Sequence, residues 1–127
     1  MNLIIDVPLA ISFGAVPGAL SRYYLTILFG RWFGLNFPYG TLFINVSGAF
    51  LMGFFATLVS KFAIDSTVSL LIAVGFLGSY TTFSTYALDT SNLLRTKNYQ
   101  AALLYWSGTP ILGFISIEVG ILLAKML

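Results

Sequence analysis

Four long apolar runs constrain this chain more than any other feature of its sequence. They cover approximately residues 7–29, 41–60, 67–94 and 101–124. Each is close to or above the roughly 20 residues that an α-helix needs to cross a bilayer. Only 8% of the 127 residues are charged and 58% are hydrophobic, which leaves too little polar surface for a water-soluble globule. The sequence therefore predicts an all-α integral membrane protein: one domain (1–127) of four transmembrane helices with both termini on one side.

The residue types that are missing exclude several kinds of chemistry. The sequence has no cysteine and no histidine, which removes disulfides, thiolate nucleophiles, imidazole bases and the commonest zinc sites. Its acidic residues are too scattered to suggest a metal cage: Asp6, Asp65, Asp89 and Glu118. We therefore do not expect an enzyme. The first ten residues also lack the basic start of a signal peptide, so we expect the first run to be retained as a helix.

Lysine and arginine near the ends of the runs barely define an orientation. Lys61 and Lys125 lie on the side of the termini, whereas Arg31, Arg95 and Lys97 lie on the opposite side. Because this bias sets how a membrane protein inserts, such a small difference leaves two interpretations open. Either one orientation prevails narrowly, or chains insert both ways and pair as an antiparallel dimer.

Small residues suggest where helices pack closely. Gly14 and Gly18 in the first run, and Ala49 and Gly53 in the second, are spaced four apart. This spacing favours close approach of membrane helices. Four short helices enclose little interior on their own, so an aqueous path through such a protein needs a partner chain.

The third run is overlong and polar in its middle. It contains the stretch GFLGSYTTFSTYALD (75–89), in which two glycines precede a dense set of hydroxyl side chains. Irregular backbone survives in a bilayer only where it is buried or lines a cavity. We therefore expect the third helix to be broken near the membrane midplane, around residues 76–82, with carbonyls free for a cation and N–H groups for an anion. The alternative is an unbroken helix whose hydroxyls bond to its own carbonyls.

Neutral polar groups in the last three runs suggest a path for a small anion. Amide and hydroxyl donors can replace the water around an anion, and the electropositive edges of aromatic rings can add to them. Phe83 and Tyr86 lie three apart, on one helix face, although core packing is the commoner use of such a pair. The other candidates are Asn45, the hydroxyls of the third run, Tyr105, Ser107 and Thr109.

Two charges lie inside the runs at different depths. Arg22 lies toward the far end of the first run and Glu118 toward the terminal end of the fourth. A central arginine costs roughly 2.5–3.5 kcal/mol to insert, and snorkelling of Arg22 to the interface is the simple explanation. If one chain is inverted, however, Arg22 of one subunit shares a depth with Glu118 of the other. An intersubunit contact between them is therefore a hypothesis.

Three motifs give the chain a resemblance to a known family. GAVPGALSRYY, YGTLFINVSG and GFLGSYTTFSTYALD resemble the three signatures of the Fluc/CrcB fluoride channels, in the expected order and over essentially all four runs. The resemblance implies a fluoride-selective channel of the cell (inner or plasma) membrane that exports fluoride passively from the cytoplasm and lowers its toxicity. It also implies an antiparallel, dual-topology homodimer with two pores and a structural sodium ion at its centre.

The resemblance also assigns roles to residues. It implies that main-chain carbonyls of Gly78 and Thr81 from both subunits hold the sodium, and that Arg22 matches the arginine of the first signature. Tyr86 stands where the family has the second of two phenylalanines, and its phenol either offers the anion a further donor or narrows the path. The pore and fluoride-binding positions implied in this way are Asn45, Phe83, Ser84, Thr85, Tyr86, Tyr105 and Thr109.

Other functions and partners remain open from sequence. A proton-coupled exporter of small cations needs a carboxylate inside the membrane, and Glu118 is the one deep candidate, although it lies off-centre. A structural or assembly protein would carry no ion flux. The partner of the chain is either a second copy of itself or a related second chain.

Overall fold

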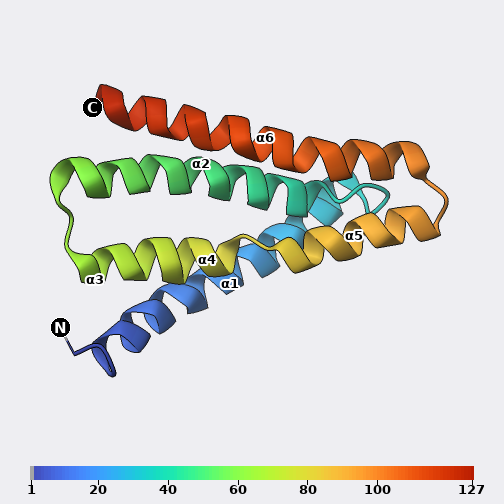
Figure 1. The fold of residues 1–127 in the computed structure, drawn as a ribbon. Helices are drawn as coiled ribbons and strands as arrows, with labels where there is room; N and C mark the ends of the chain where they lie inside the picture. The colour runs from blue at the N-terminus through green and yellow to red at the C-terminus, as the bar shows by residue number, and fades with distance from the viewer. Residues whose placement is uncertain (1) are drawn as a thin grey trace.

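The computed structural model describes residues 2–127, and that part of the chain is helical throughout apart from short loops. Three long helices are continuous: α1 (Asp6–Phe33), α2 (Tyr39–Phe62) and α6 (Tyr99–Met126). The chain runs back and forth along one direction, so that both termini lie at the same end of the molecule (Figure 1). The prediction of an all-helical chain is confirmed, and residues 2–127 contain no strand.

Between α2 and α6 the chain forms a composite helix in two halves. The first half consists of α3 (Ser66–Ser69), a π-helical segment η1 (Leu70–Leu77) and α4 (Gly78–Tyr80), and the second half is α5 (Phe83–Arg95). Thr81 (φ −78°, ψ 153°) and Thr82 (φ −150°, ψ 118°) join the halves in extended conformation. The predicted break in the third helix is therefore present, and it is visible in Figure 1 between α4 and α5.

Three helical stretches are long and apolar enough to cross a membrane: Tyr39–Phe62, Ser66–Arg95 and Tyr99–Met126. α1 has a similar length, but Arg22, two prolines and two adjacent tyrosines interrupt its apolar sequence. Membrane-length helices are thus confirmed for three of the four expected spans. The remaining span, which is the first run of the sequence and lies in α1, stays a prediction.

Glycines let the helices approach closely in two places. A Cβ at Gly14 would lie 1.9 Å from the carbonyl oxygen of Leu71, and one at Gly18 would lie 2.3 Å from that of Phe76. The backbone of α1 therefore lies directly against η1. A Cβ at Gly53 in α2 would likewise lie 2.3 Å from a main-chain oxygen of α6. The prediction that Gly14, Gly18 and Gly53 serve close helix packing is confirmed.

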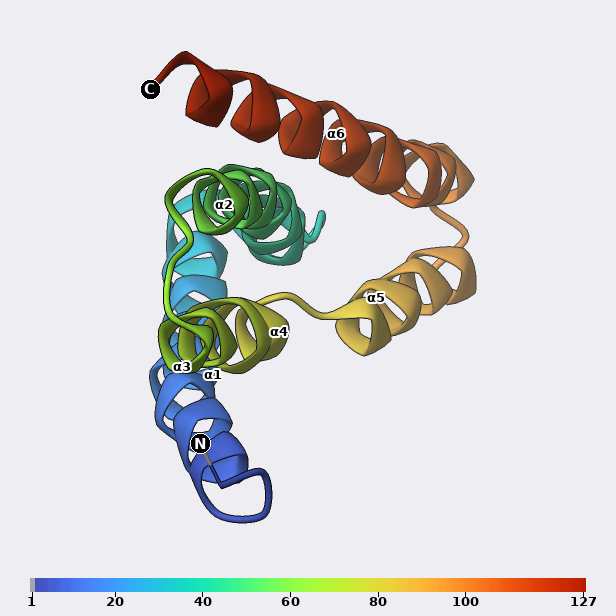
Figure 2. The same cartoon turned by 60° about the vertical axis from the view of Figure 1, so that its left-hand side comes forward.

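The long helices form two packed pairs that meet at the break. α1 packs across η1 and α4, and α6 packs along α2. At the extended link α5 turns away from the line of α4 and packs on the first part of α6 (Figure 2). The largest fully buried side chains are Ile44, Leu77 and Tyr105. The break in the composite helix lies against α2 and faces α6, so polar side chains from three helices meet beside it.

Candidate functional site

Asn45 in α2 holds the extended link in place. Its Oδ1 accepts a hydrogen bond from the N–H of Thr82 at 2.8 Å, and its Nδ2 donates to the Thr82 carbonyl at 3.0 Å. In a continuous helix that N–H would donate to the carbonyl of Gly78, four residues earlier. One carboxamide thus replaces backbone hydrogen bonds that the break removes. The amide nitrogen of Asn45 retains one further N–H.

The carbonyl groups of Gly78 and Thr81 lose their usual helical donors at the break. The N–H of Thr82 donates to Asn45 instead of Gly78, and the N–H of Thr85 donates to Thr82 Oγ1 at 3.2 Å instead of to Thr81. The Thr82 hydroxyl in this way caps the start of α5. Two carbonyl oxygens one turn apart are therefore released from the helix at the positions predicted to bind a cation.

Hydroxyl groups before the link are hydrogen-bonded within the chain. Ser79 Oγ lies 2.9 Å from the carbonyl oxygen of Ala15 in α1 and 2.8 Å from that of Gly75 in its own helix. The hydroxyls of Tyr80 and Ser47 in α2 lie 2.9 Å apart, and Thr81 Oγ1 donates to a carbonyl one turn earlier at 3.0 Å. The Ser79 and Tyr80 contacts fasten the broken segment to α1 and α2, and the Thr81 bond lies within the composite helix, so all three hydroxyls have protein partners.

A cavity of about 330 Å³ lies beside the link, between α2, α5 and α6. We call it the Thr109 cavity. Thr109 Oγ1 is buried and has no hydrogen-bond partner among residues 2–127, so its donor is available to a ligand that enters. The residues of the wall are all uncharged: Asn45, Thr81, Thr82, Phe83, Tyr86, Thr109, Pro110 and Gly113. The structure thus brings together four of the predicted pore residues, namely Asn45, Phe83, Tyr86 and Thr109.

Three aromatic rings lead from the surface at this cavity into the interior. The ring centroids of Phe83 and Tyr86 are 5.7 Å apart, and those of Tyr86 and Tyr105 are 5.4 Å apart. Phe83 is 79% exposed in the single chain, whereas Tyr105 is 1% exposed. Both ring pairs are tilted, by 48° and 45°, an arrangement in which ring edges as well as faces are presented.

Asp89 lies at the inner end of this row of rings and was not among the predicted site residues. Its Oδ2 accepts a hydrogen bond from the Tyr105 hydroxyl at 3.2 Å. Asp89 also lines two further cavities, of about 150 and 540 Å³, that loop residues before α2 help to form. Its position three residues after Tyr86, on the same face of α5, is the sequence signal that identifies it.

The other predicted residues lie away from the Thr109 cavity. Ser84 is exposed, and its Oγ lies 3.2 Å from Thr82 Oγ1. Thr85 lines the smaller cavity beside Asp89. Arg22 is partly exposed on α1, and its side chain forms no hydrogen bond or ion pair with residues 2–127 of its own chain.

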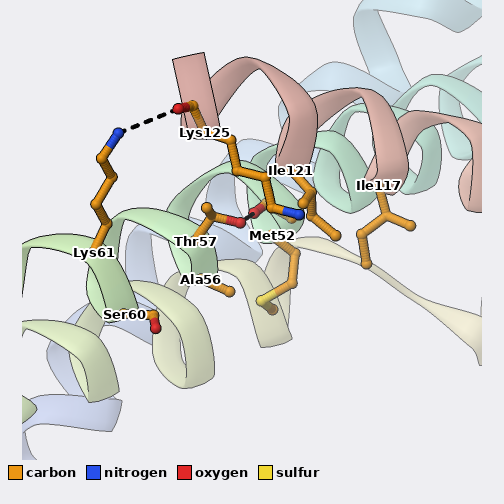
Figure 3. Close-up of a pocket in the computed structure, with 9 residues that line it drawn as sticks. Met52, Ala56, Thr57, Ser60, Lys61, Ile117, Ile121 and Lys125 are labelled. Atoms are coloured by element: carbon orange, nitrogen blue, oxygen red, sulfur yellow. Dashed lines mark hydrogen bonds between the residues drawn. The ribbon is translucent and has the colours of Figure 1, made fainter. Parts of the chain in front are cut away.

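A cationic cavity of about 550 Å³ lies between α2 and α6 near the termini (Figure 3). Lys61 Nζ donates to the main-chain carbonyl of Lys125 at 3.2 Å across its mouth. The wall beneath is formed by small and apolar residues, which include Gly53, Ala56 and Ile117. Two ammonium groups at one opening raise the local concentration of anions.

Comparison with known proteins gives a consistent set of relatives. The family described as CrcB-like protein, Camphor Resistance (CrcB), matches residues 9–121. The chain is 57% identical over 121 residues to a fluoride-specific ion channel FluC of Trichormus variabilis, covering 94% of this chain and 88% of the relative. The FluC channel of a Synechococcus species is 50% identical over 121 residues (94% and 93% of the two chains). That of Aquifex aeolicus is 40% identical over 119 residues (93% and 96%).

Proposed function

Because this chain belongs to the CrcB family, we propose that it is a fluoride-selective ion channel of the cell membrane. Relatives at 57% and 50% identity carry the name fluoride-specific ion channel. Within this chain, the observation that carries the proposal is the unpartnered Thr109 hydroxyl, buried beside a cavity whose wall is uncharged.

The wall of the Thr109 cavity fits the main physical demand of fluoride transport. Fluoride is small and tightly hydrated, so a channel must offer donors that replace its water. The hydroxyl of Thr109, the remaining N–H of Asn45 and the edges of the Phe83 and Tyr86 rings are such groups. None of them carries a fixed positive charge that would trap the ion. Chloride is larger and fits a narrow donor-lined path poorly.

In this proposal transport is passive. Fluoride that dissociates from HF in the cytoplasm leaves down its own electrochemical gradient, which lowers its toxicity. The ammonium groups of Lys61 and Lys125 attract anions to one opening of the protein. Passive flow of an ion needs no chemical step, so we do not expect the protein to be an enzyme.

We also propose that the channel is an antiparallel, dual-topology homodimer in which α1 forms the fourth span. Phe83 is 79% exposed in the single chain, although it belongs to the wall of the Thr109 cavity, and a second copy would enclose it. The Arg22 side chain has no partner among residues 2–127, and Glu118 is exposed on α6, so both side chains are available for the intersubunit contact. Cross-linking of cysteines placed at positions 22 and 118 would test this intersubunit contact. A disulfide that forms only within monomers would exclude the contact.

The residues at the break fit a structural sodium ion at the centre of that dimer. Gly78 and Thr81 have carbonyls that the break releases from their helical donors, and unwound backbone carbonyls are typical sodium ligands in membrane proteins. A cation there would join the two breaks and raise the local potential for an anion. Replacing sodium by N-methylglucamine should then weaken the dimer, measured as its dissociation in detergent. A dimer equally stable without sodium would contradict this part of the proposal.

The deciding experiment is fluoride efflux from liposomes that contain the purified protein, with chloride as the control anion. We expect fluoride efflux that far exceeds chloride efflux. Absent fluoride flux, or chloride flux of equal size, would overturn the proposal.

A proton-coupled exporter that depends on Glu118 has less support. Glu118 is exposed on α6 and lines none of the cavities described above. Such an exporter would show proton-linked efflux of an organic cation that Glu118→Gln abolishes.

A further inference from the structure

Helix α6 has a hydrogen-bonding defect at Pro110. Pro110 lies inside the helix and has no N–H, so the carbonyl of Trp106, four residues earlier, lacks its helical donor. An unpaired carbonyl is costly in apolar surroundings. The structure supplies a replacement donor, because the hydroxyl of Tyr86 in α5 donates a hydrogen bond to the Trp106 carbonyl.

We propose that Tyr86 is a positioning residue whose hydroxyl closes the defect made by Pro110 and thereby fixes the Tyr86 ring in the wall of the anion path. This inference rests on the proposed fluoride channel. Tyr86 and Pro110 both line the Thr109 cavity, so the hydrogen bond joins α5 to α6 at the cavity itself. The Tyr86 ring also contacts the rings of Phe83 and Tyr105, so its orientation affects the whole row.

The hydrogen bond decides which group of Tyr86 faces the anion. A phenol has one proton, and the Trp106 carbonyl accepts it. The hydroxyl is therefore not a further donor for fluoride, and Tyr86 offers the ring edge. The bond also occupies a carbonyl oxygen whose negative dipole end, if left free beside a cavity-wall residue, would repel an anion strongly in low dielectric.

The inference predicts that Tyr86→Phe slows fluoride flux, although this substitution removes only a hydroxyl group. Phenylalanine keeps the ring, but it leaves the Trp106 carbonyl without a donor. We expect fluoride flux to fall about tenfold, as the loss of one hydrogen bond to a carbonyl in apolar surroundings would give.

Pro110→Ala supplies the test of mechanism, because alanine restores an N–H that can donate to the Trp106 carbonyl. In the Pro110→Ala background, Tyr86→Phe should therefore change fluoride flux by less than about twofold, since the carbonyl already has a donor. Tyr99→Phe is the matched control. Tyr99 is 62% exposed and its hydroxyl has no hydrogen bond among residues 2–127, so its removal should leave flux unchanged in both backgrounds.

Each outcome of this two-by-two comparison decides the inference. An equal loss of flux in both backgrounds would mean that the hydroxyl acts on the ion itself, and no loss in either would mean that the bond is unimportant for transport. Lower unfolding stability without a change in flux per folded dimer would reduce Tyr86 to a structural role. Any of these three results overturns the inference. If Tyr86→Phe does not fold, the double variant should still fold and conduct, and its failure would overturn the inference as well.

The inference and the proposed function can fail separately. Wild-type protein without fluoride flux would overturn the function. The coupling between Tyr86→Phe and Pro110→Ala can then still be measured by unfolding in detergent, where additive effects would show that the hydrogen bond does not compensate for the proline.

Discussion

The carboxamide of Asn45 and the backbone of Thr82 form two hydrogen bonds in opposite directions, of 2.8 and 3.0 Å. The pair is similar to a rung between two strands, with a side chain in place of the second backbone. It lets extended residues persist between two helices. Asn45 therefore has a structural role in addition to the pore role that the sequence predicts.

Asn45→Ala should destabilise the protein as well as slow fluoride flux. The N–H and C=O of the buried Thr82 lose their partners, which should lower the free energy of unfolding by about 1–3 kcal/mol. Denaturant titration in detergent measures this. Asn36→Ala, in the exposed loop before α2, is the control for stability. An Asn45→Ala protein as stable as wild type would show that the two hydrogen bonds between Asn45 and Thr82 do not contribute to the stability of the fold.

Thr109→Val should slow fluoride flux by about tenfold without loss of stability. The hydroxyl has no hydrogen-bond partner in the described chain, so valine removes a donor for the ion and breaks no bond within the protein. Thr26→Val is the control, because the Thr26 hydroxyl bonds to a carbonyl of its own helix, α1, at 2.8 Å, and Thr26 does not line the Thr109 cavity. Equal fluoride efflux rates from wild-type and Thr109→Val liposomes would rule out the assigned donor.

Phe83→Ile should reduce flux and leave the unfolding of the subunit unchanged. Phe83 is 79% exposed in the single chain, so little burial is lost, whereas the electropositive ring edge disappears. Phe114→Ile is the matched control on α6, where the ring is 68% exposed. If both substitutions change the fluoride efflux rate equally, the Phe83 ring does not contribute specifically to the fluoride path.

Gly14→Val should prevent correct packing of α1 on η1. A Cβ there would lie 1.9 Å from the carbonyl oxygen of Leu71, so the helices must separate, at a cost of about 1–3 kcal/mol or more. Gly108→Ala is the control, since its Cβ meets no atom within 4 Å, and it should be neutral or slightly stabilising. The yield of folded dimer by size-exclusion chromatography and the unfolding midpoint both report the difference, and a well-folded Gly14→Val protein would refute it.

Acid should weaken the start of the composite helix through Asp65. Asp65 Oδ2 accepts the N–H of Thr67 at 2.7 Å, and this hydrogen bond lowers the pKa of the carboxyl below 3.8. Because the folded pKa is below the unfolded one, the stabilisation is complete above about pH 4 and is lost as pH falls through the folded value. Hydrogen exchange of amides 67–70 should rise on acidification beyond its intrinsic pH dependence. Asp65→Asn, which caps without titrating, should abolish that excess, and an unchanged excess would exclude Asp65.

Much of this arrangement follows from local properties of the sequence. Run length and low charge predicted the helices, the four-residue spacing of Gly14 and Gly18 predicted close packing, and the hydroxyls after Gly78 predicted the break. These features depend on neighbours in the chain and on the energetics of polar groups in hydrocarbon.

The partners of the polar groups could not be predicted in the same way. Asn45 and Thr82 are 37 residues apart, and Tyr86 and Trp106 are 20 apart, so each bond depends on how separate helices pack. Asp89 was missed for this reason, since its contact with Tyr105 exists only once α5 lies on α6. The carbonyl that Pro110 leaves unpaired follows from the sequence, but the contact of the Tyr86 hydroxyl with it depends on how α5 packs on α6.

The hydrogen bonds of Ser79, Tyr80 and Thr82 have a consequence for biosynthesis. Their partners, Ala15 in α1, Ser47 and Asn45 in α2, are all translated earlier. A nascent composite helix therefore meets helices that already present partners for these three residues, whereas the partners of Tyr86 and Asp89 arrive only with α6. The order of synthesis thus supplies partners for the break before the last helix is made.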